Sequence, residues 1–213
     1  MASPVRVLGA IIAGGGSRRF GRPKATAEVG GLAMIDWSLR ALMEDVTDVV
    51  VVGGDPAVAE SRGLGHLVDA APDGGPLAGL VSALRAATDR GLHGVFALAC
   101  DMPLVDATVV RALLRHAAGE EVVAPLGPRG PEQLCAFYPS ACLGVAERRL
   151  AMSDLSLRAL LKVVPVRTVD VAGITEPAEA EALLMSVNTP EDVPKAEALL
   201  SARSRPAEPQ PAP

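Results

Sequence analysis

Short apolar runs alternate along this chain with segments that are apolar on one side only. The runs at residues 5–12, 48–52 and 94–100 consist almost entirely of apolar residues, which is typical of strands buried on both faces of a sheet. Strands that alternate with helices form βαβ units, in which neighbouring strands are parallel. The pattern therefore predicts an α/β fold with a mainly parallel sheet and helices on both of its faces.

Three segments between or after these strands have apolar residues at helical spacing. The first covers residues 33–44, the second begins after the turn at residues 73–76, and the third follows the strand at 94–100. In the second, Pro76 is well placed at the start of a helix. The expected inward-facing positions are Ile35, Leu39 and Leu42 in the first helix, Leu77, Leu80, Val81 and Leu84 in the second, and Val110, Leu113, Leu114 and Ala117 in the third.

The rest of the chain shows shorter patterns of the same kinds. Thr189, Pro190 and the acidic residues after them are typical of a helix N-terminus. The other expected elements are strands at 66–68, 122–125, 134–138 and 183–187, a loop at 126–133, a helix at 153–161 and an extended segment at 163–171.

A glycine-rich stretch follows the first expected strand. Residues 13–16 are Ala-Gly-Gly-Gly, where no side chain keeps a ligand from the backbone and free amides can bind an anion. A strand, a glycine loop and a cationic segment together favour a polyphosphate site, whereas a glycine turn beside a solvated basic face is the alternative. The cationic residues are Arg18, Arg19, Arg22 and Lys24.

Two well-known phosphate-binding motifs do not fit this loop. A P-loop has Lys-Ser or Lys-Thr after its last glycine, and here Gly21 is followed by Arg22 and Pro23. The dinucleotide-binding motif opens a helix, whereas here the glycines are followed by arginines and a proline. The loop therefore belongs to neither class.

The ends of four expected strands carry residues suited to a metal–nucleotide complex. In parallel sheets, ligands bind beyond the carboxyl ends of the strands. Glycines follow two of the strands, at Gly14 and Gly53, and carboxylates follow the other two, at Asp69 and Asp101. We expect these residues to lie together at one edge of the sheet. An Asp in the position of Asp101 is also a common turn residue, and Asp73 is expected to form a turn.

Composition and charge limit the number of domains, the partners and the cellular location expected for this chain. The 213 residues are 49% hydrophobic, so a single domain is expected at 1–203, followed by a disordered Pro-rich tail at 204–213. The net charge of −5 and the 2% of aromatic residues argue against nucleic acid as a partner. Three cysteines without paired spacing, and no signal-peptide or membrane-spanning pattern, predict a cytoplasmic protein with no membrane partner.

Several segments of the chain resemble those of one family. The loop IIAGGGSRRFGRPK is similar to the signature loop of the MobA-like nucleotidyltransferases, which are related to molybdenum cofactor guanylyltransferase. GGPLAGLVSAL, ALACDMPLV and SVNTPEDV resemble three later segments, in the same order and at about the same spacing, and SLRALL resembles a further one. The resemblance implies a three-layer α/β/α Rossmann-like fold. It also implies transfer of GMP from GTP to the phosphate of molybdopterin, with release of pyrophosphate.

The same resemblance implies roles for individual residues. Asp101 is expected to bind Mg²⁺, Asp69 to contact the nucleotide near its base or ribose, and Asn188 to lie on the pterin side. The expected catalytic residues are Lys24, Asp101 and Arg18. Arg18 is expected from the chemistry rather than from the resemblance, because the leaving pyrophosphate needs a cation, which Arg18 or Arg19 could supply. The expected nucleotide-binding residues are Ile12, Ala13, Gly14, Gly15, Lys24, Gly53, Asp69 and Asp101. Molybdenum-insertion proteins and molybdoenzyme chaperones are the implied protein partners.

The sequence departs from the family pattern at several positions. Pro23 stands where the family often has Asp, and Phe20 replaces the usual Met. Gly53 stands where some members have a nucleotide-contacting Asn, and Ser186 replaces the first Asn of an N-x-N arrangement. A molybdopterin cytidylyltransferase, a transferase with another phosphate acceptor, and a nucleotide-binding partner protein without turnover are therefore alternatives. The glycine that follows Gly14 favours the guanylyl branch.

Overall fold

The computed structural model describes residues 5–14, 20, 23–171 and 182–203. Within these ranges, a central sheet has the strand order β10-β7-β9-β6-β1-β4-β5, and β8 pairs with β7 beside this row. β2 and β3 form a separate hairpin. The strands are β1 (Val7–Ile12), β2 (Glu28–Val29), β3 (Leu32–Ala33), β4 (Asp48–Val52), β5 (Gly65–Leu67), β6 (Gly94–Ala99), β7 (Val122–Gly127), β8 (Gly130–Pro131), β9 (Cys135–Pro139) and β10 (Val166–Val169).

The central sheet is mainly parallel. β1 is parallel to both of its neighbours, β4 and β6, and the pairs β4–β5 and β7–β10 are parallel as well. In the described row of strands only β9 runs the other way, since it is antiparallel to β6 and to β7. The predicted mainly parallel α/β sheet is confirmed.

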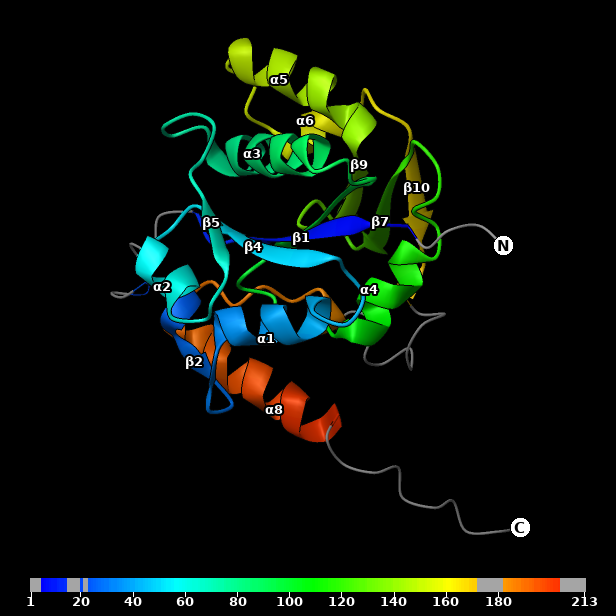
Figure 1. Cartoon of the computed structure of the whole chain (residues 1–213). Helices are drawn as coiled ribbons and strands as arrows, with labels where there is room; N and C mark the ends of the chain where they lie inside the picture. Colours follow the sequence, from blue (N-terminus) through cyan, green and yellow to red (C-terminus); the bar gives the residue numbers. More distant parts are fainter. Residues whose placement is uncertain (1–4, 15–19, 21–22, 172–181, 204–213) are drawn as a thin grey trace, which may run out of the picture.

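Helices lie on both faces of the sheet, which gives the molecule three layers (Figure 1). One face is covered by α3 (Gly75–Asp89), α5 (Leu143–Ala151) and α6 (Leu157–Leu160). The other is covered by α1 (Met34–Leu42), α2 (Pro56–Glu60) and α4 (Ala107–Leu114), with α8 (Val193–Arg203) packed outside α1. This arrangement confirms the three-layer α/β/α fold.

The central strands are buried on both faces because alternate side chains meet different helical layers. In β1, Val7 and Ile11 pack into the core beside α1 and α4, whereas Leu8, Ala10 and Ile12 pack into the core beside α3. β6 alternates in the same way. The continuous apolar runs of the sequence therefore correspond to these buried strands, as predicted.

The three predicted helices correspond to α1, α3 and α4. The four expected inward positions of α3 are fully buried, as are Ile35 and Leu42 of α1. Asp106 ends the preceding loop and caps α4, because its side chain accepts the backbone N–H groups of Thr108 and Val109. α4 ends at Leu114, so the predicted position Ala117 is buried but lies beyond the helix.

The strand predicted at residues 183–187 is wrong. Ala182 and Leu183 are helical, Leu184 lies in a turn, and the residues after it are irregular. The N–H of Val187 donates to the carbonyl of Asp101 at 2.8 Å, so this backbone pairs with a strand-end loop rather than with a strand. The run is apolar for another reason: Leu183 and Leu184 pack into the core beside α1 and α4, whereas Met185 and Val187 pack into a small cluster with Val29 of β2 and Ala196 of α8.

The segments on either side of β9 also differ from the prediction. The predicted loop at 126–133 contains β8, which pairs with the end of β7 as a hairpin. In the predicted helix at 153–161 only α6 forms, because Ser153 has a positive φ of 56° and Ser156 caps α6 by accepting the N–H of Ala159. α5, just before this segment, was not predicted. The extended segment predicted at 163–171 contains a shorter strand, β10.

The helix start after Asn188 is confirmed. Thr189 and Asp192 form a capping box around the short 3-10 helix Pro190–Asp192, which leads into α8. The predicted disordered tail at 204–213 lies outside the described residues. In the described part of the chain, no helix is long and apolar enough to cross a membrane.

Candidate active site

The carboxyl ends of β1, β4, β5 and β6 meet at one edge of the sheet. Backbone hydrogen bonds continue past the strands themselves: the N–H of Ala13 donates to Val52, that of Gly53 to Leu67, and that of Cys100 to Ile12, at 2.9, 2.9 and 3.2 Å. The residues that follow these four strands are therefore neighbours in space, as the strand-end argument predicted.

The carboxylate of Asp69 lies against a floor of glycines. A Cβ atom on Gly53 would be 2.9 Å from Asp69 Oδ2 and 3.1 Å from the Cα of Gly14, and the φ of Gly53 is +69°. A Cβ on Gly14 or on Gly79 would also approach this carboxylate, at 3.3 and 3.1 Å. Glycine is needed here for close approach as well as for backbone conformation.

Burial raises the pKa of Asp69 above its ordinary value, and the nearby charge of His66 opposes that rise. The ring of His66 lies 3.1 Å from the carbonyl oxygen of Gly53, so it belongs to the same strand-end cluster. Asp69 is therefore held in a partly desolvated place where a nucleotide can contact it.

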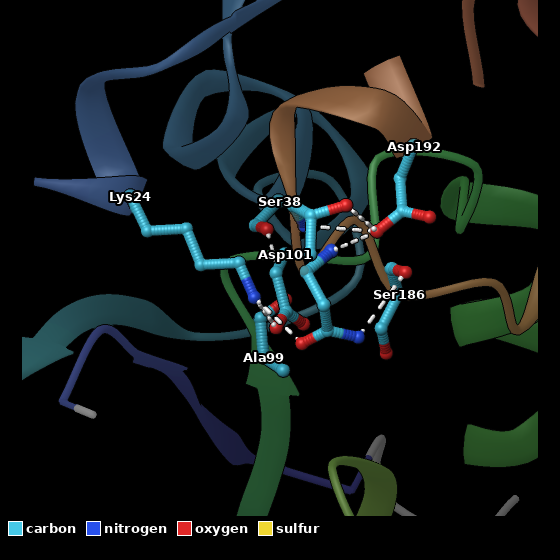
Figure 2. Close-up of polar contacts among 8 residues, drawn as sticks. Lys24, Ser38, Ala99, Asp101, Ser186 and Asp192 are labelled. Atoms are coloured by element: carbon cyan, nitrogen blue, oxygen red, sulfur yellow. Dashed lines mark hydrogen bonds and ion pairs between the residues drawn. The ribbon is translucent and has the colours of Figure 1, made fainter. Parts of the chain in front are cut away.

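Lys24 and Asp101 form the charged centre of the site (Figure 2). Lys24 begins a short 3-10 helix after the glycine loop, and Asp101 follows β6. The ammonium Nζ of Lys24 is 2.5 Å from Asp101 Oδ2, and the two side chains are 18% and 20% exposed. Ser38 of α1 donates to the carbonyl of Ala99 at 3.4 Å and so helps to fix the end of β6. The two charged groups are partly desolvated but open to a ligand.

Asn188, near the C-terminal end of the described chain, contacts the same charged centre. Its side-chain oxygen accepts a hydrogen bond from Lys24 Nζ at 3.0 Å. The carboxylate of Asp192 accepts the backbone N–H groups of Asn188 and Thr189, both at 2.8 Å, and these bonds lower its pKa. The Nδ2 of Asn188 donates to the backbone carbonyl of Ser186 at 3.3 Å. The substitution of Ser for Asn at 186 therefore leaves this contact available, because it uses only the backbone.

Two cavities adjoin at Gly14 and Asp69, which line both. One has a volume of about 320 Å³ and is bounded by Ile12 and the turn at the start of α3. The other, of about 220 Å³, is bounded by Ala13 and Lys24. Among the predicted nucleotide-binding residues, these cavities bring together Ile12, Ala13, Gly14, Lys24 and Asp69, with Gly53 packed against Asp69 and Asp101 bonded to Lys24.

The residues present fit a magnesium ion held mainly by its substrate. Within the described residues no group of three or more His, Cys, Asp or Glu side chains could hold a metal by itself. Mg²⁺ is commonly bound through one or two carboxylates together with substrate phosphates. Asp101, a partly exposed carboxylate paired with the Lys24 that lines one of the cavities, can supply such a ligand.

The predicted site residues Gly15 and Arg18, like Arg19, lie outside the described residues.

Some residues of this edge were not predicted from the sequence. Gly79 lies inside α3, where glycine is unfavourable, and its close approach to Asp69 explains its presence. A glycine in the middle of a strongly apolar helix was the available signal. Arg129 on the β7–β8 turn and Arg158 on α6 line a cavity together with Asn188, and no local sequence pattern indicated that they meet.

Comparisons with known proteins identify a family for this sequence. The sequence matches the MobA-like NTP transferase domain over residues 9–194. A protein of Pelotomaculum thermopropionicum, described as a probable molybdenum cofactor guanylyltransferase, is 31% identical over 192 residues, which cover 90% of this chain and 92% of that protein. The molybdenum cofactor guanylyltransferase of Desulfosudis oleivorans is 31% identical over 198 residues, covering 92% of this chain and 96% of that protein.

A solved structure supports the fold independently. Molybdopterin-guanine dinucleotide biosynthesis protein A of Archaeoglobus fulgidus has a TM-score of 0.72 and 23% identity, covering 92% of this chain and 100% of that chain. The matched range 9–194 includes Lys24, Asp69, Asp101 and Asn188. On this evidence the chain belongs to the MobA-like NTP transferase family and is an enzyme of the nucleotidyltransferase class.

Proposed function

We propose that this protein transfers GMP from GTP to the phosphate of molybdopterin and releases pyrophosphate, with Mg²⁺ as cofactor, in the cytoplasm. The observation that carries the proposal is the convergence of Lys24, Asp101 and Asn188 beside two cavities floored by Gly14. A cation and a carboxylate thus lie together next to a cavity that Lys24 lines, which supports a site for a nucleoside triphosphate and its metal. The guanylyltransferase relatives support the choice of GTP and molybdopterin as substrates.

The reaction requires positioning and charge neutralisation more than proton transfer. An acceptor phosphate monoester has a second pKa of about 6, so it is mostly dianionic at neutral pH and needs no general base. Its oxygen forms a bond to the α-phosphorus of GTP, and the bond from that phosphorus to the bridging oxygen breaks, so pyrophosphate leaves with the electron pair. The three histidines, His66, His93 and His116, line neither of the cavities beside Lys24.

Lys24 is the cation best placed to neutralise the phosphates. Its ammonium already lies against one carboxylate, so a triphosphate that enters has to compete for it with Asp101 or share it. Bound Mg²⁺ would supply Lewis-acid neutralisation of the phosphate oxygens, with Asp101 as a ligand. The N–H of Ala13 is already bonded to Val52, so the backbone of the glycine loop after it would hold the nucleotide in line with the acceptor.

The first test is thermal unfolding with Mg²⁺ and each of GTP, CTP, ATP and UTP. A ligand at a hundred times its dissociation constant stabilises the folded state by about 2.7 kcal/mol, which gives a clear shift of the midpoint. We expect a Mg²⁺-dependent shift with GTP alone, followed by release of pyrophosphate when molybdopterin is added. A shift with CTP alone would replace the guanylyl assignment with a cytidylyl one. Binding of GTP without pyrophosphate release would favour a non-catalytic nucleotide-binding protein.

A further inference from the structure

A separate polar cavity lies next to Asn188. Its volume is about 310 Å³, close to the lower end of the range for small-molecule sites. Three parts of the chain that are distant in sequence form its wall: the β7–β8 hairpin, α6 and the segment at residues 184–188. The polar side chains that line it are Arg129, Glu132, Gln133, Arg158, Ser186 and Asn188.

The charges in this cavity favour an anion. Arg129 lies on the turn between β7 and β8, and Arg158 lies on α6. Within the described residues neither guanidinium has an ion pair or a side-chain hydrogen bond, whereas Arg62, Arg85 and Arg111 all pair with carboxylates. Two uncommitted guanidinium groups that face one hollow are suited to bind a phosphate, whose oxygens match their fork of donors.

The carboxylate in the cavity is already engaged with the backbone. Glu132 Oε1 accepts the N–H of Gln133 at 2.9 Å and that of Leu134 at 3.4 Å. These bonds hold Glu132 in place and reduce its repulsion of an anion. The described lining therefore carries two positive charges and one negative charge.

Asn188 joins this cavity to the reaction centre. It lines the cavity, and its side-chain oxygen is 3.0 Å from Lys24 Nζ, which in turn contacts Asp101. A molecule in the cavity is thus separated by one side chain from the place proposed for the nucleotide phosphates. An acceptor has to be held next to the nucleotide in order to react with it, and this cavity is adjacent to the proposed nucleotide position.

We propose that the cavity binds the acceptor and that Arg129 and Arg158 hold its phosphate monoester. The inference rests on the proposed transferase function and adds the residues that select an anionic acceptor. The two guanidinium groups orient the phosphate and offset its repulsion from the triphosphate, and they take no part in bond making. The attacking oxygen, the broken bond and the leaving pyrophosphate are those of the reaction described above.

The test compares Arg129→Gln, Arg158→Gln and the double variant with Arg115→Gln. Arg115 is exposed and lies outside the lining of this cavity, so the control removes the same charge elsewhere. Initial rates are measured against molybdopterin at saturating Mg²⁺ and GTP. We expect each cavity variant to raise the KM for molybdopterin roughly tenfold or more, which corresponds to the loss of a charged hydrogen bond. The KM for GTP and the GTP-induced shift of the unfolding midpoint should stay at wild-type values.

The outcomes separate this inference from the proposed function. An active wild-type enzyme with unchanged KM for molybdopterin in the double variant would overturn the assignment of the two arginines. A wild-type enzyme that transfers nothing to molybdopterin would overturn the proposed acceptor instead. The anion site is then tested with inorganic phosphate at saturating Mg²⁺ and GTP. A further midpoint shift in the wild type and in Arg115→Gln but not in the double variant supports the site, and equal shifts in all of them reject it.

Discussion

At the scale of single residues, Asp101 and Lys24 should dominate turnover. Asp101→Asn keeps the size of the side chain but removes the charge that pairs with Lys24 and can bind Mg²⁺. We expect it to lower the rate of pyrophosphate release by about 10² to 10³-fold or more, the loss typical when a charge-stabilising group is removed. Lys24→Ala should have a loss of similar size. Initial rates with GTP and molybdopterin measure both.

The control for these variants is Asp89→Asn, which neutralises an exposed carboxylate at the end of α3. It should leave the rate unchanged. Circular dichroism and the unfolding midpoint check that each variant is folded. Near-normal activity in Asp101→Asn would show that Asp101 is not the metal ligand. An unchanged rate in Lys24→Ala would show that the cationic loop is only a solvent-exposed charged surface.

Gly53 tests the close approach of backbone and carboxylate. Gly53→Ala forces an L side chain into φ +69° and places its Cβ 2.9 Å from Asp69 Oδ2. Gly63→Ala is a matched control, because Gly63 has nearly the same φ, +66°, but open space around the added Cβ. The left-handed backbone should cost each variant about 1–2 kcal/mol. Only Gly53→Ala should also reduce the GTP-induced shift of the unfolding midpoint. Equal midpoint shifts in the two variants would contradict the claim that the close approach of Gly53 to Asp69 matters for nucleotide binding.

At the scale of elements, the capping box before α8 positions Asn188. Asp192→Asn should lower the free energy of unfolding by about 0.5–2 kcal/mol, as loss of a helix cap does. The backbone N–H bonds depress the pKa of Asp192, so its contribution is present above the unfolded-state pKa and is lost as the pH falls through the folded-state pKa. Urea unfolding at pH 7 and in steps down to acid should therefore show the difference between wild type and variant disappearing below about pH 4.

Glu191→Gln is the control for that series, since it removes the same charge from the neighbouring exposed residue. It should reproduce none of the pH-dependent loss. A difference that persists into acid would show that Asp192 contributes by packing rather than as an ionised cap.

The elements also show what a sequence can and cannot predict. β1 and β6 were predicted because their burial on both faces leaves a continuous apolar run. The run at 183–187 has the same appearance, but its backbone pairs with Asp101, and nothing local distinguishes the two cases. Strand-end geometry brought Gly14, Asp69 and Asp101 together in advance. The hydrogen bond from Lys24 to Asn188 joins residues 164 positions apart. Local patterns of apolar and polar residues could not show this contact, and only the family resemblance pointed to Asn188.

At the scale of the whole molecule, the three cysteines report on global unfolding. Cys100, Cys135 and Cys142 are buried free thiols at the edge or in the middle of the core. Burial raises the pKa of Cys100 to about 12 and that of Cys142 to about 11, so few thiolates form near neutral pH in the folded state. We therefore expect a thiol reagent to label the native protein only through the small population of molecules that are open.

Ligand binding should slow this labelling through the folding equilibrium. If labelling requires global opening, Mg²⁺ and GTP at a hundred times the dissociation constant should reduce its rate about a hundredfold, since the same 2.7 kcal/mol then opposes opening. Labelling is followed at pH 8 with and without ligand, and Cys100→Ala identifies the contribution of the thiol next to Asp101. Fast labelling of Cys100 alone, suppressed by GTP while the other two stay slow, would instead show a local opening of the strand ends, where GTP is proposed to bind.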